Sequence, residues 1–207
     1  MNGGQRSDPG GSTAADGGIR FLDIVLSLTA LAIAWPVILG CAVLIAATSK
    51  GAPLFAQTRV GRNERPFICY KLRTMRKDAP NVASHEMAAS AVTPVGMVLR
   101  RVKLDELPQM INVLRGDMSF VGPRPSLPTQ LQLVEARRRL GLFYVRPGIT
   151  GPAQIQGIDM SDPERLAAVD VVWLKRRTIR GYFVTIFLTA LGRGQGDRVR
   201  VKGVLEQ

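Results

Sequence analysis

Residues 24–47 read IVLSLTALAIAWPVILGCAVLIAA, a run of 24 residues without a charged side chain. As an α-helix, a run of this length reaches about 36 Å, enough to cross a hydrocarbon core of about 30 Å. The apolar region of a secretory signal peptide is shorter, at about 7–15 residues. A helix buried in a soluble core is the remaining alternative, but the length and the absence of charge favour lipid. We therefore expect a membrane helix over residues 19–48.

Pro36 stands in the middle of this run. It cannot donate a hydrogen bond to the carbonyl of Ala32, and its ring crowds that carbonyl, so a kink is expected. A mild kink is compatible with a helix that spans the bilayer, whereas a sharp one produces a re-entrant hairpin with both ends on the same side. From these residues alone, a kinked span is the commoner outcome.

The segment that follows is strongly basic. Between residues 50 and 77 there is one acid, Glu64, against eight basic residues: Lys50, Arg59, Arg62, Arg65, Lys71, Arg73, Arg76 and Lys77. Positive charge beside a membrane helix tends to stay in the cytoplasm, and it also attracts anionic lipid. We therefore expect residues 49–195 to form a domain on the cytoplasmic side.

The chain of 207 residues carries 28 Lys and Arg against 16 Asp and Glu, a formal net charge of +12. This balance indicates an anionic partner, either nucleic acid, phospholipid headgroups or a phosphorylated substrate. Cys41 and Cys69 do not suggest a disulfide framework, so we expect both to be reduced. The single histidine, His85, has only Glu86 beside it and is interpreted as a surface-loop residue. Acid–base chemistry would then rest mainly on carboxylates.

Weaker patterns outline the rest of the chain. Residues 1–18, rich in Gly, Ser and Asp, are expected to be a disordered tail, and residues 196–207 a C-terminal tail. Two β-prone runs flank a Gly-Arg-Asn-Glu turn at 61–64, and residues 78–92 are typical of a polar loop.

Three stretches favour helix: residues 94–101, 105–116 and 163–191. The second would place Leu107, Ile111 and Leu114 on one face. Residues 145–157 are too rich in Gly and Pro for either regular element. The expected fold is α+β and mainly helical, with a membrane helix and a small domain that includes interfacial amphipathic helices.

The last helical run mixes aromatic and apolar residues with cations: Trp173, Lys175, Arg176, Arg177, Arg180, Tyr182, Phe183, Ile186, Phe187 and Leu191. Aromatic rings beside arginines suit a helix that lies in the headgroup layer. A packed core helix with a solvated basic end explains the pattern equally well.

Asp105 and Glu106 are adjacent carboxylates shortly before Pro108. Proline is tolerated in the first turn of a helix, so the helix is expected to begin near Asp105. Both carboxylates would then lie at its positive end, which also attracts phosphate oxygens and a divalent cation that bridges them. Taken alone, the pair is also consistent with an ordinary N-cap and first-turn acid.

Arg124 changes this weighing, because Pro123 and Pro125 restrict the backbone on both sides of it. A preorganised guanidinium matches phosphate through two parallel hydrogen bonds. Further cations that such a pocket could include are Lys71, Arg73, Arg100 and Arg101. A carboxylate nucleophile or base, a metal and cations for phosphate charge are the requirements of phosphoryl transfer.

Three blocks carry a resemblance: KLRTM (71–75), LDELPQMINVLRGDMSFVGPRP (104–125) and RPGITGPAQ (146–154). They resemble the monotopic bacterial sugar transferases, the small single-domain polyprenyl-phosphate phosphoglycosyl transferases, over about residues 20–195. The chain looks like the minimal catalytic unit, without the extra N-terminal membrane helices of larger relatives.

The resemblance implies an activity. Members transfer a sugar-1-phosphate from a UDP-sugar to undecaprenyl phosphate with Mg²⁺, releasing UMP, through a covalent phosphosugar on the Asp of the Asp-Glu pair. This is the first membrane step in bacterial O-antigen, exopolysaccharide, capsule or glycoprotein synthesis. It implies an enzyme of the bacterial inner membrane, with its active site on the cytoplasmic face.

Carried over by resemblance, Asp105 is the nucleophile and metal ligand, and Glu106 is its partner. The implied phosphate-binding residues are Lys71, Arg73, Arg100, Arg124 with its flanking Pro123 and Pro125, and Arg146. Family members insert a re-entrant helix that is broken at a proline, which favours Pro36 as the break and reverses the preference for a kinked span.

Some positions depart from the family pattern. Lys103 stands where relatives often carry Ser or Thr, Pro152 where an aromatic is frequent, and QIQGID (154–159) replaces a more usual segment. These departures leave the sugar open. The implied partners are a UDP-sugar, undecaprenyl phosphate and anionic lipids, while downstream glycosyltransferases or a second copy of the chain are further options.

A membrane-anchored, non-enzymatic protein with a basic binding face is the alternative function. Its support is the net charge alone, whereas nucleic-acid binding would lead one to expect exposed basic and aromatic residues interleaved or a known motif. The basic residues cluster instead around the apolar run and the acid pair, so no nucleic-acid partner is expected. Within the family, an acceptor built on another polyprenol phosphate is also compatible with the sequence.

Overall fold

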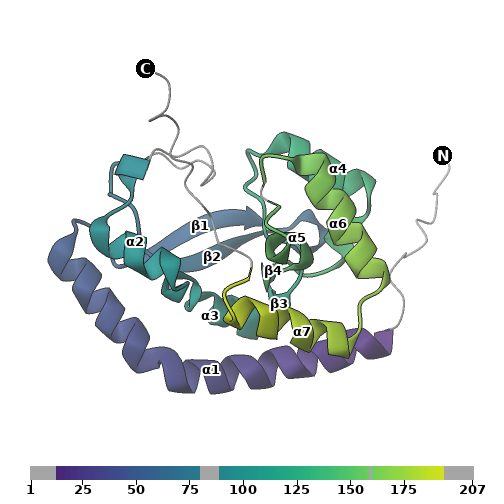
Figure 1. The fold of residues 1–207 in the computed structure, drawn as a ribbon, viewed down its shortest axis with the longest axis horizontal. Coiled ribbons are helices and arrows are strands. Elements are labelled where there is room, and N and C mark those ends of the chain that lie inside the picture. Colours follow the sequence, from purple (N-terminus) through teal and green to yellow (C-terminus); the bar gives the residue numbers. More distant parts are fainter. Residues whose placement is uncertain (1–12, 80–88, 159, 194–207) are drawn as a thin grey trace.

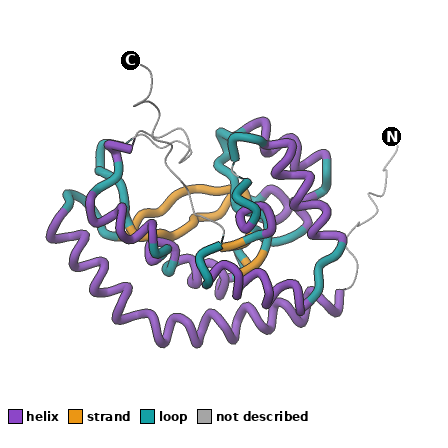
Figure 2. The backbone as a smooth tube through the Cα atoms, viewed as in Figure 1, coloured by secondary structure: helices purple, strands orange, loops and turns teal. Residues whose placement is uncertain are grey.

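The computed structural model describes residues 13–79, 89–158 and 160–193. The expected α+β, mainly helical class is confirmed: helices surround a two-stranded hairpin and a second short strand pair (Figures 1 and 2). Expectations for His85, residues 1–12 and residues 196–207 fall outside the described residues.

The elements are α1 (Thr13–Thr48), β1 (Leu54–Val60), η1 (Arg62–Glu64), β2 (Pro66–Leu72), η3 (Ala89–Ala91), α2 (Pro94–Arg101), η4 (Leu104–Glu106), α3 (Gln109–Arg115), β3 (Ser119–Val121), α4 (Leu131–Arg139), η5 (Leu142–Tyr144), β4 (Gly148–Thr150), α5 (Pro152–Ile155), α6 (Pro163–Lys175) and α7 (Ile179–Ala190).

The exposed and buried faces of α1 reverse the usual pattern of a helix on a soluble domain. Ile19, Asp23 and Ser27, spaced four residues apart, are buried on one face. The exposed large side chains are apolar: Phe21, Val25, Leu28, Ile33, Trp35, Val37, Leu39, Val43 and Leu44. Within the described residues, one helix (Asp16–Thr48) is long and apolar enough to cross a membrane. Such an apolar face fits contact with lipid.

The structure continues α1 through Pro36 as a single helix. Figure 1 shows this helix bent along the lower side of the domain, not folded back on itself. Its second half packs on the domain through Ile38, Cys41, Ala42 and Ile45, which contact a cluster that includes Leu72 and Leu99. The structure therefore does not show the sharp hairpin expected at Pro36: α1 is one bent helix, and both of its halves contact the same domain.

The first turns of α1 are held by distant partners. Ile19 packs with Val121 and Tyr182, and Asp16 forms an ion pair with Arg177. The helix consequently begins at Thr13, inside the stretch 1–18 that composition alone assigns to a tail.

Asp23 anchors α1 to two other elements. Its Oδ1 accepts hydrogen bonds from Ser119 Oγ at 2.9 Å and from the Phe120 amide at 3.0 Å, next to each other in β3. The same oxygen accepts from the Tyr182 hydroxyl of α7 at 2.8 Å. One buried carboxyl group thus ties together α1, β3 and α7.

Replacing Asp23 by alanine is expected to lower the free energy of unfolding by about 3 kcal/mol, because buried donors lose their acceptor. Thermal unfolding in detergent would measure the loss. Asp16→Ala is the control, since it removes an acid of the same helix from a partly exposed ion pair of small value. A loss in Asp23→Ala as small as that of the control would mean that apolar packing, and not these hydrogen bonds, holds α1.

β1 and β2 form an antiparallel hairpin, which confirms the two β-prone runs. Helix α3 covers the free edge of β2: Asn112 Oδ1 accepts from the Tyr70 amide at 3.1 Å, and Asn112 Nδ2 donates to the Ile68 carbonyl at 2.6 Å. The buried residues of α3 are Gln109, Asn112 and Val113, while Ile111 is exposed. Leu107, Ile111 and Leu114 are not among the buried residues, because a polar contact with β2 decides which face of α3 is buried.

Residues 145–157 contain a strand and a helical turn, so the expectation of no regular structure is wrong. β4 pairs with β3 in parallel, with Ser119 opposite Gly148. A Cβ at Gly148 would meet backbone atoms of Gly122 and Thr150. Glycine is needed here for a close approach of two backbones, which composition alone does not distinguish from a loop.

α6 and α7 confirm the helical run at 163–191, with a break between Lys175 and Ile179. Thr178 caps α7, accepting from the Gly181 amide at 3.0 Å. α7 buries Tyr182 and Thr185, and its exposed large apolar residues are Ile179, Phe183, Val184 and Phe187. It is thus packed on one face and apolar on the exposed face.

Candidate active site

Asp105 and Glu106 lie in the 3-10 turn η4, between α2 and α3. Both residues are buried, with 7% and 9% of their surface exposed. The turn closes through the Leu107 amide, which donates to the Leu104 carbonyl at 3.3 Å. Pro108 is the N-cap of α3, so the α-helix begins after the two acids and not near Asp105 as expected. The acid pair therefore sits in a tight turn that leads into α3.

Glu106 is bound by two cations from distant parts of the chain. Its Oε1 accepts from Arg124 Nη2 at 2.8 Å and lies 3.4 Å from Lys71 Nζ. All three side chains are largely buried, at 10%, 11% and 15% exposed respectively. Charge-assisted hydrogen bonds are stronger in such surroundings than in water. The structure thus brings together Glu106, Arg124 and Lys71, and Asp105 precedes Glu106 in the same turn.

Lys103 adds a third cation to this region. It enters the turn in the left-handed conformation, with φ of 59°, and its Nζ donates to the Arg193 carbonyl at 3.3 Å. Burial lowers the pKa of Lys103; the charge of Glu106 opposes this shift and that of Arg124 adds to it. Cations thus outnumber carboxylates around the turn, which suits a polyanionic ligand such as a diphosphate.

The loop that carries Arg124 (residues 122–126) is held by its backbone carbonyls. Four successive carbonyls accept hydrogen bonds: Pro123 from the Gly148 amide at 2.9 Å, Arg124 from Arg137 Nη1 at 2.6 Å, Pro125 from Arg59 Nη1 at 3.0 Å and Ser126 from the Val60 amide at 2.9 Å. These contacts, with the two prolines, hold the backbone that presents the Arg124 guanidinium.

Arg137 of α4 and Asp170 of α6 form a buried ion pair behind this loop. Their side chains are 3% and 1% exposed, and Arg137 Nη2 lies 3.1 Å from Asp170 Oδ2. Burial raises the pKa of Asp170 to about 6, although Arg137 opposes the shift.

Sequence reasoning missed Arg137, Asp170 and the buried Arg59. Arg137 belongs to the stretch EARRR, which is typical of a solvated basic face. The usable signal was its position four residues after Leu133, which places both on one side of a helix. Both residues are indeed buried.

Arg73 and Arg100, two further predicted phosphate-binding residues, lie in different places. Arg73 Nε donates to the Ala52 carbonyl at 2.7 Å, and its guanidinium lies over the Phe55 ring at 5.7 Å from the centroid. Arg100 is in the last turn of α2, and its carbonyl accepts from the Lys103 amide at 3.2 Å. The backbone of Arg100 is therefore tied to the entrance of η4, while Arg73 contacts the start of the hairpin.

Arg146 lies at the other end of α3. Its Nε donates to the Gly116 carbonyl at 2.8 Å, and Arg20 donates to the Val113 and Leu114 carbonyls at 2.5 and 2.7 Å. Cations stabilise the carbonyl end of a helix. Burial and the neighbouring arginines lower the pKa of Arg146. The structure therefore does not bring Arg146 to the acid pair, and the seven residues of α3, about 10 Å long, lie between them.

Cys69 lies in β2 close to the charged cluster and is almost fully buried. Burial raises the pKa of its thiol, and the charges of Lys71, Arg59 and Arg124 oppose the shift. Both cysteines are free, which confirms the expectation of no disulfide between them.

The acid pair offers a metal ion only part of a coordination shell. Within the described residues, no group of three or more His, Cys, Asp and Glu side chains gathers to hold a metal. Mg²⁺ needs no such group, because it is commonly bound by one or two carboxylates together with substrate phosphates and water. The residues present therefore fit a Mg²⁺ ion that arrives with, or is completed by, a phosphorylated substrate.

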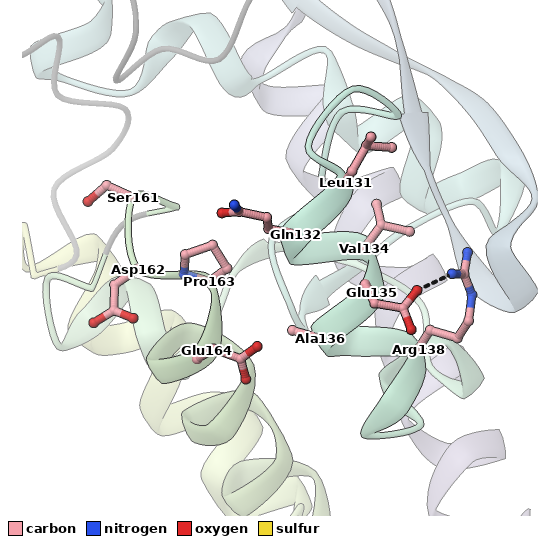
Figure 3. Close-up of a pocket in the computed structure, with 10 residues that line it drawn as sticks. All are labelled: Leu131, Gln132, Val134, Glu135, Ala136, Arg138, Ser161, Asp162, Pro163 and Glu164. Atoms are coloured by element: carbon pink, nitrogen blue, oxygen red, sulfur yellow. Dashed lines mark hydrogen bonds and ion pairs between the residues drawn. The ribbon is translucent and has the colours of Figure 1, made fainter.

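A separate cavity of about 700 Å³ opens between α4 and α6 (Figure 3). Its lining residues are Leu131, Gln132, Val134, Glu135, Ala136, Arg138, Ser161, Asp162, Pro163 and Glu164. On one wall Arg138 Nη1 pairs with Glu135 at 2.5 Å. No residue of the predicted site is among its lining, so this cavity is distinct from the acid pair.

Comparison with known proteins places these residues in a family. The model of the family described as bacterial sugar transferase matches residues 16–193. That match spans α1, the acid-pair turn, the Arg124 loop and both C-terminal helices.

Three relatives illustrate the likeness. A UDP-glucose:undecaprenyl-phosphate glucose-1-phosphate transferase of Caulobacter vibrioides is 43% identical over 157 residues, covering 72% of this chain and 59% of the relative. A UDP-N-acetylgalactosamine-undecaprenyl-phosphate N-acetylgalactosaminephosphotransferase of Aeromonas hydrophila is 41% identical, covering 66% of this chain and 33% of the relative. The exopolysaccharide production protein ExoY of Sinorhizobium fredii is 32% identical over 84% of both chains.

The chain therefore spans less than two thirds of the first two relatives. The family model, by contrast, covers nearly all of the part of the chain that the structure describes. The chain belongs to the bacterial sugar transferase family.

Proposed function

We propose that the chain transfers a sugar-1-phosphate from a UDP-sugar to undecaprenyl phosphate, giving undecaprenyl-diphosphate-sugar and UMP. The observation that carries the proposal is the buried Asp105–Glu106 turn, in which Glu106 is bound by Lys71 and Arg124. The printed activities of the Caulobacter and Aeromonas relatives supply the donor and acceptor classes. The exopolysaccharide role of other relatives favours a pathway of that kind.

The reaction proceeds in two displacements. A carboxylate oxygen of Asp105 attacks the phosphorus that bears the sugar, the bond from this phosphorus to the bridging oxygen breaks, and UMP leaves with that oxygen. A phosphate oxygen of undecaprenyl phosphate then attacks the same phosphorus and breaks its bond to Asp105. The carboxylate is regenerated, and no net proton is gained or lost. Splitting the reaction lets a soluble donor and a membrane acceptor use one site in turn.

The cations hold the phosphates and offset charge as the bonds change. Arg124 and Lys71 are assigned to this role because both reach Glu106, and Arg100 contributes positive charge from the end of α2. Glu106 keeps the two cations aligned in the absence of substrate. Arg73 and Arg146 donate to backbone carbonyls elsewhere, so the proposal gives them no direct contact with the reacting phosphorus.

Mg²⁺ is assigned to Asp105 together with the donor phosphates, and when bound it would neutralise phosphate charge. The protein supplies few carboxylates, so metal affinity should rise with nucleotide present. The reason is that Mg²⁺ is usually bound by one or two carboxylates, with substrate phosphates and water as the other ligands.

We further propose that α1 enters the membrane from one side, with both ends at the cytoplasmic face. Two sets of contacts support this arrangement: Asp23 in the first half binds β3 and α7, and Ile45 in the second half packs near Leu72 and Leu99. A straight span of about 30 Å would carry one half away from a domain outside the bilayer. The bent course of α1 keeps both of its halves on the domain (Figure 1), and the exposed apolar residues of α7 favour its lying at the same surface.

The test is UMP release by the protein in nanodiscs that contain undecaprenyl phosphate and Mg²⁺, across a panel of UDP-sugars. Release with one donor, dependent on the lipid, is the expected result and identifies the sugar. A second readout uses donor labelled in its sugar and β-phosphate without acceptor, which should leave label on the protein at up to one equivalent. The absence of both release and label with every donor would contradict the proposed reaction.

A further inference from the structure

We propose that Arg137, oriented by Asp170, is a positioning residue for Arg124, and that Arg59 holds the same loop from its other side. The inference rests on the proposed function, because it assigns these buried residues to the alignment of a phosphate-binding guanidinium. None of them reaches the reacting atoms, so each acts through the backbone of residues 122–126.

A continuous line of contacts leads from α6 to the acid pair. Asp170 Oδ2 binds Arg137 Nη2 at 3.1 Å, and Arg137 Nη1 donates to the Arg124 carbonyl at 2.6 Å. Arg124 Nη2 then donates to Glu106 Oε1 at 2.8 Å. One guanidinium, Arg137, thereby links α6 directly to the residue whose side chain faces the catalytic turn.

The second contact comes from β1. Arg59 Nη1 donates to the Pro125 carbonyl at 3.0 Å, while its Nε and Nη2 donate to Gln57 Oε1 at 3.0 and 2.5 Å. Arg59 and Gln57 are both buried. Two adjacent carbonyls, of Arg124 and Pro125, are thus bound by guanidinium groups from different elements. The first of these carbonyls belongs to a peptide plane that flanks the Arg124 side chain, and the second to the next plane along the loop.

Stability alone is a poor explanation for the Arg137–Asp170 pair. Burying two charges costs more than an apolar pair of similar volume would, so such pairs are weak evidence for stabilisation. Arg137 Nε is also buried without a hydrogen-bond partner in the part of the chain that the structure describes. The Arg137 guanidinium also donates from Nη1 to the Arg124 carbonyl, and this contact gives a charged side chain at this position a function.

A matched control exists in the same helix pair. Arg139 of α4 and Glu164 of α6 also form an ion pair, at 2.6 Å, but their side chains are 59% and 68% exposed. Like Arg137–Asp170, this pair joins α4 to α6, but both of its side chains are at the surface. A comparison of the two pairs therefore separates the link between helices from the positioning of Arg124.

The experiment compares Arg137→Met/Asp170→Leu with Arg139→Met/Glu164→Leu in the UMP-release assay, with thermal unfolding of each protein recorded. Removing both partners of the buried pair leaves no unpaired charge, so the fold should survive. We expect kcat/KM to fall about 100-fold in the first variant, because a displacement near 1 Å in a site costs this much. The control pair should stay within about twofold of wild type.

A double-mutant cycle with Arg124→Ala tests the route of the effect. If Arg137 acts through Arg124, the pair substitution should change the rate by twofold or less once Arg124 is absent. Should the double variant fail to fold, Arg137→Lys replaces it, since lysine keeps the charge but not the fork that reaches both partners. The kcat/KM of Arg137→Lys should fall at least tenfold. In a protein that already carries Arg124→Ala, the same substitution should change the rate by twofold or less.

The outcomes separate this inference from the proposed function. An inactive wild-type protein would overturn the proposed function itself. An active wild type with a buried-pair variant that matches the control would overturn the positioning role alone. The positioning role would also be overturned if the buried-pair substitution lowered kcat/KM by the same factor with and without Arg124→Ala. That result would show that the pair acts independently of Arg124.

Discussion

Replacing Asp105 by asparagine is expected to lower the rate of UMP release about 10⁴-fold or more, the scale seen when a group essential to covalent catalysis is removed. Asparagine has nearly the same shape as aspartate but lacks the anionic oxygen that attacks phosphorus in the proposed reaction. The measurement is UMP release in nanodiscs with the donor that the wild-type protein uses. Label from a sugar- and β-phosphate-labelled donor should no longer remain on the protein, because the acyl phosphate cannot form.

Two further variants sharpen this experiment. Asp78→Asn is a control, since Asp78 is an exposed acid at 3.5 Å from Arg76, and its loss should leave the rate nearly unchanged. Glu106→Gln should slow the reaction by weakening the alignment of Arg124 and Lys71, yet labelled protein should still form. If Asp105→Asn retained the label and Glu106→Gln lost it, Glu106 would be the nucleophile and Asp105 its partner.

The sequence identified Glu106, Lys71 and Arg124 as candidates because they lie in short blocks with strong local constraints. Pro123 and Pro125 restrict the backbone around Arg124, and the adjacent Asp105 and Glu106 are recognisable without a structure. The contact between Glu106 and Lys71 depends on the tertiary fold. The family resemblance placed those blocks in one site, and the structure brings Glu106, Lys71 and Arg124 within reach of one another.

The roles of the residues behind the site could not be predicted, because they depend on partners far away in the chain. Arg137 looks like one of three surface arginines until α6 places Asp170 beside it. Arg146 seemed equivalent to the other phosphate-binding candidates, yet the fold uses its guanidinium at the carbonyl end of α3. Charge and motif identify candidate cations, whereas the identity of each anion or carbonyl partner is a property of the tertiary structure.

The same limit applies to the fold. The uncharged run 24–47 is long enough to predict α1 by itself, because helix length and apolarity are local properties. The start of α1 at Thr13 and the burial of Asn112 instead depend on contacts with α7 and β2. The three-residue strands β3 and β4 are too short to carry a periodic signal. The only trace of their pairing in the sequence is Gly148, which is needed because the two backbones approach closely there.

Replacing Gly148 by alanine is therefore expected to damage both the fold and the site. The added Cβ would meet the Gly122 amide nitrogen and the Thr150 carbonyl oxygen, as well as the Gly122 oxygen at 2.7 Å. These are backbone atoms, so no flexible side chain can move aside. Overpacking of this kind should cost about 3 kcal/mol or more, which corresponds to a fall in Tm of roughly 6–12 °C for a protein of this size.

The loss should extend to activity at temperatures where the variant is still folded. The Gly148 amide donates to the Pro123 carbonyl at 2.9 Å, so a shift of β4 also shifts the loop that presents Arg124. Gly40→Ala is the control, because nothing lies within 4 Å of a Cβ added there, and alanine favours a helix. Thermal unfolding and UMP release should be measured on both variants. If Gly148→Ala kept the Tm and rate of the control, β3 and β4 could separate without consequence, and the close backbone contact would not be what holds Arg124 in place.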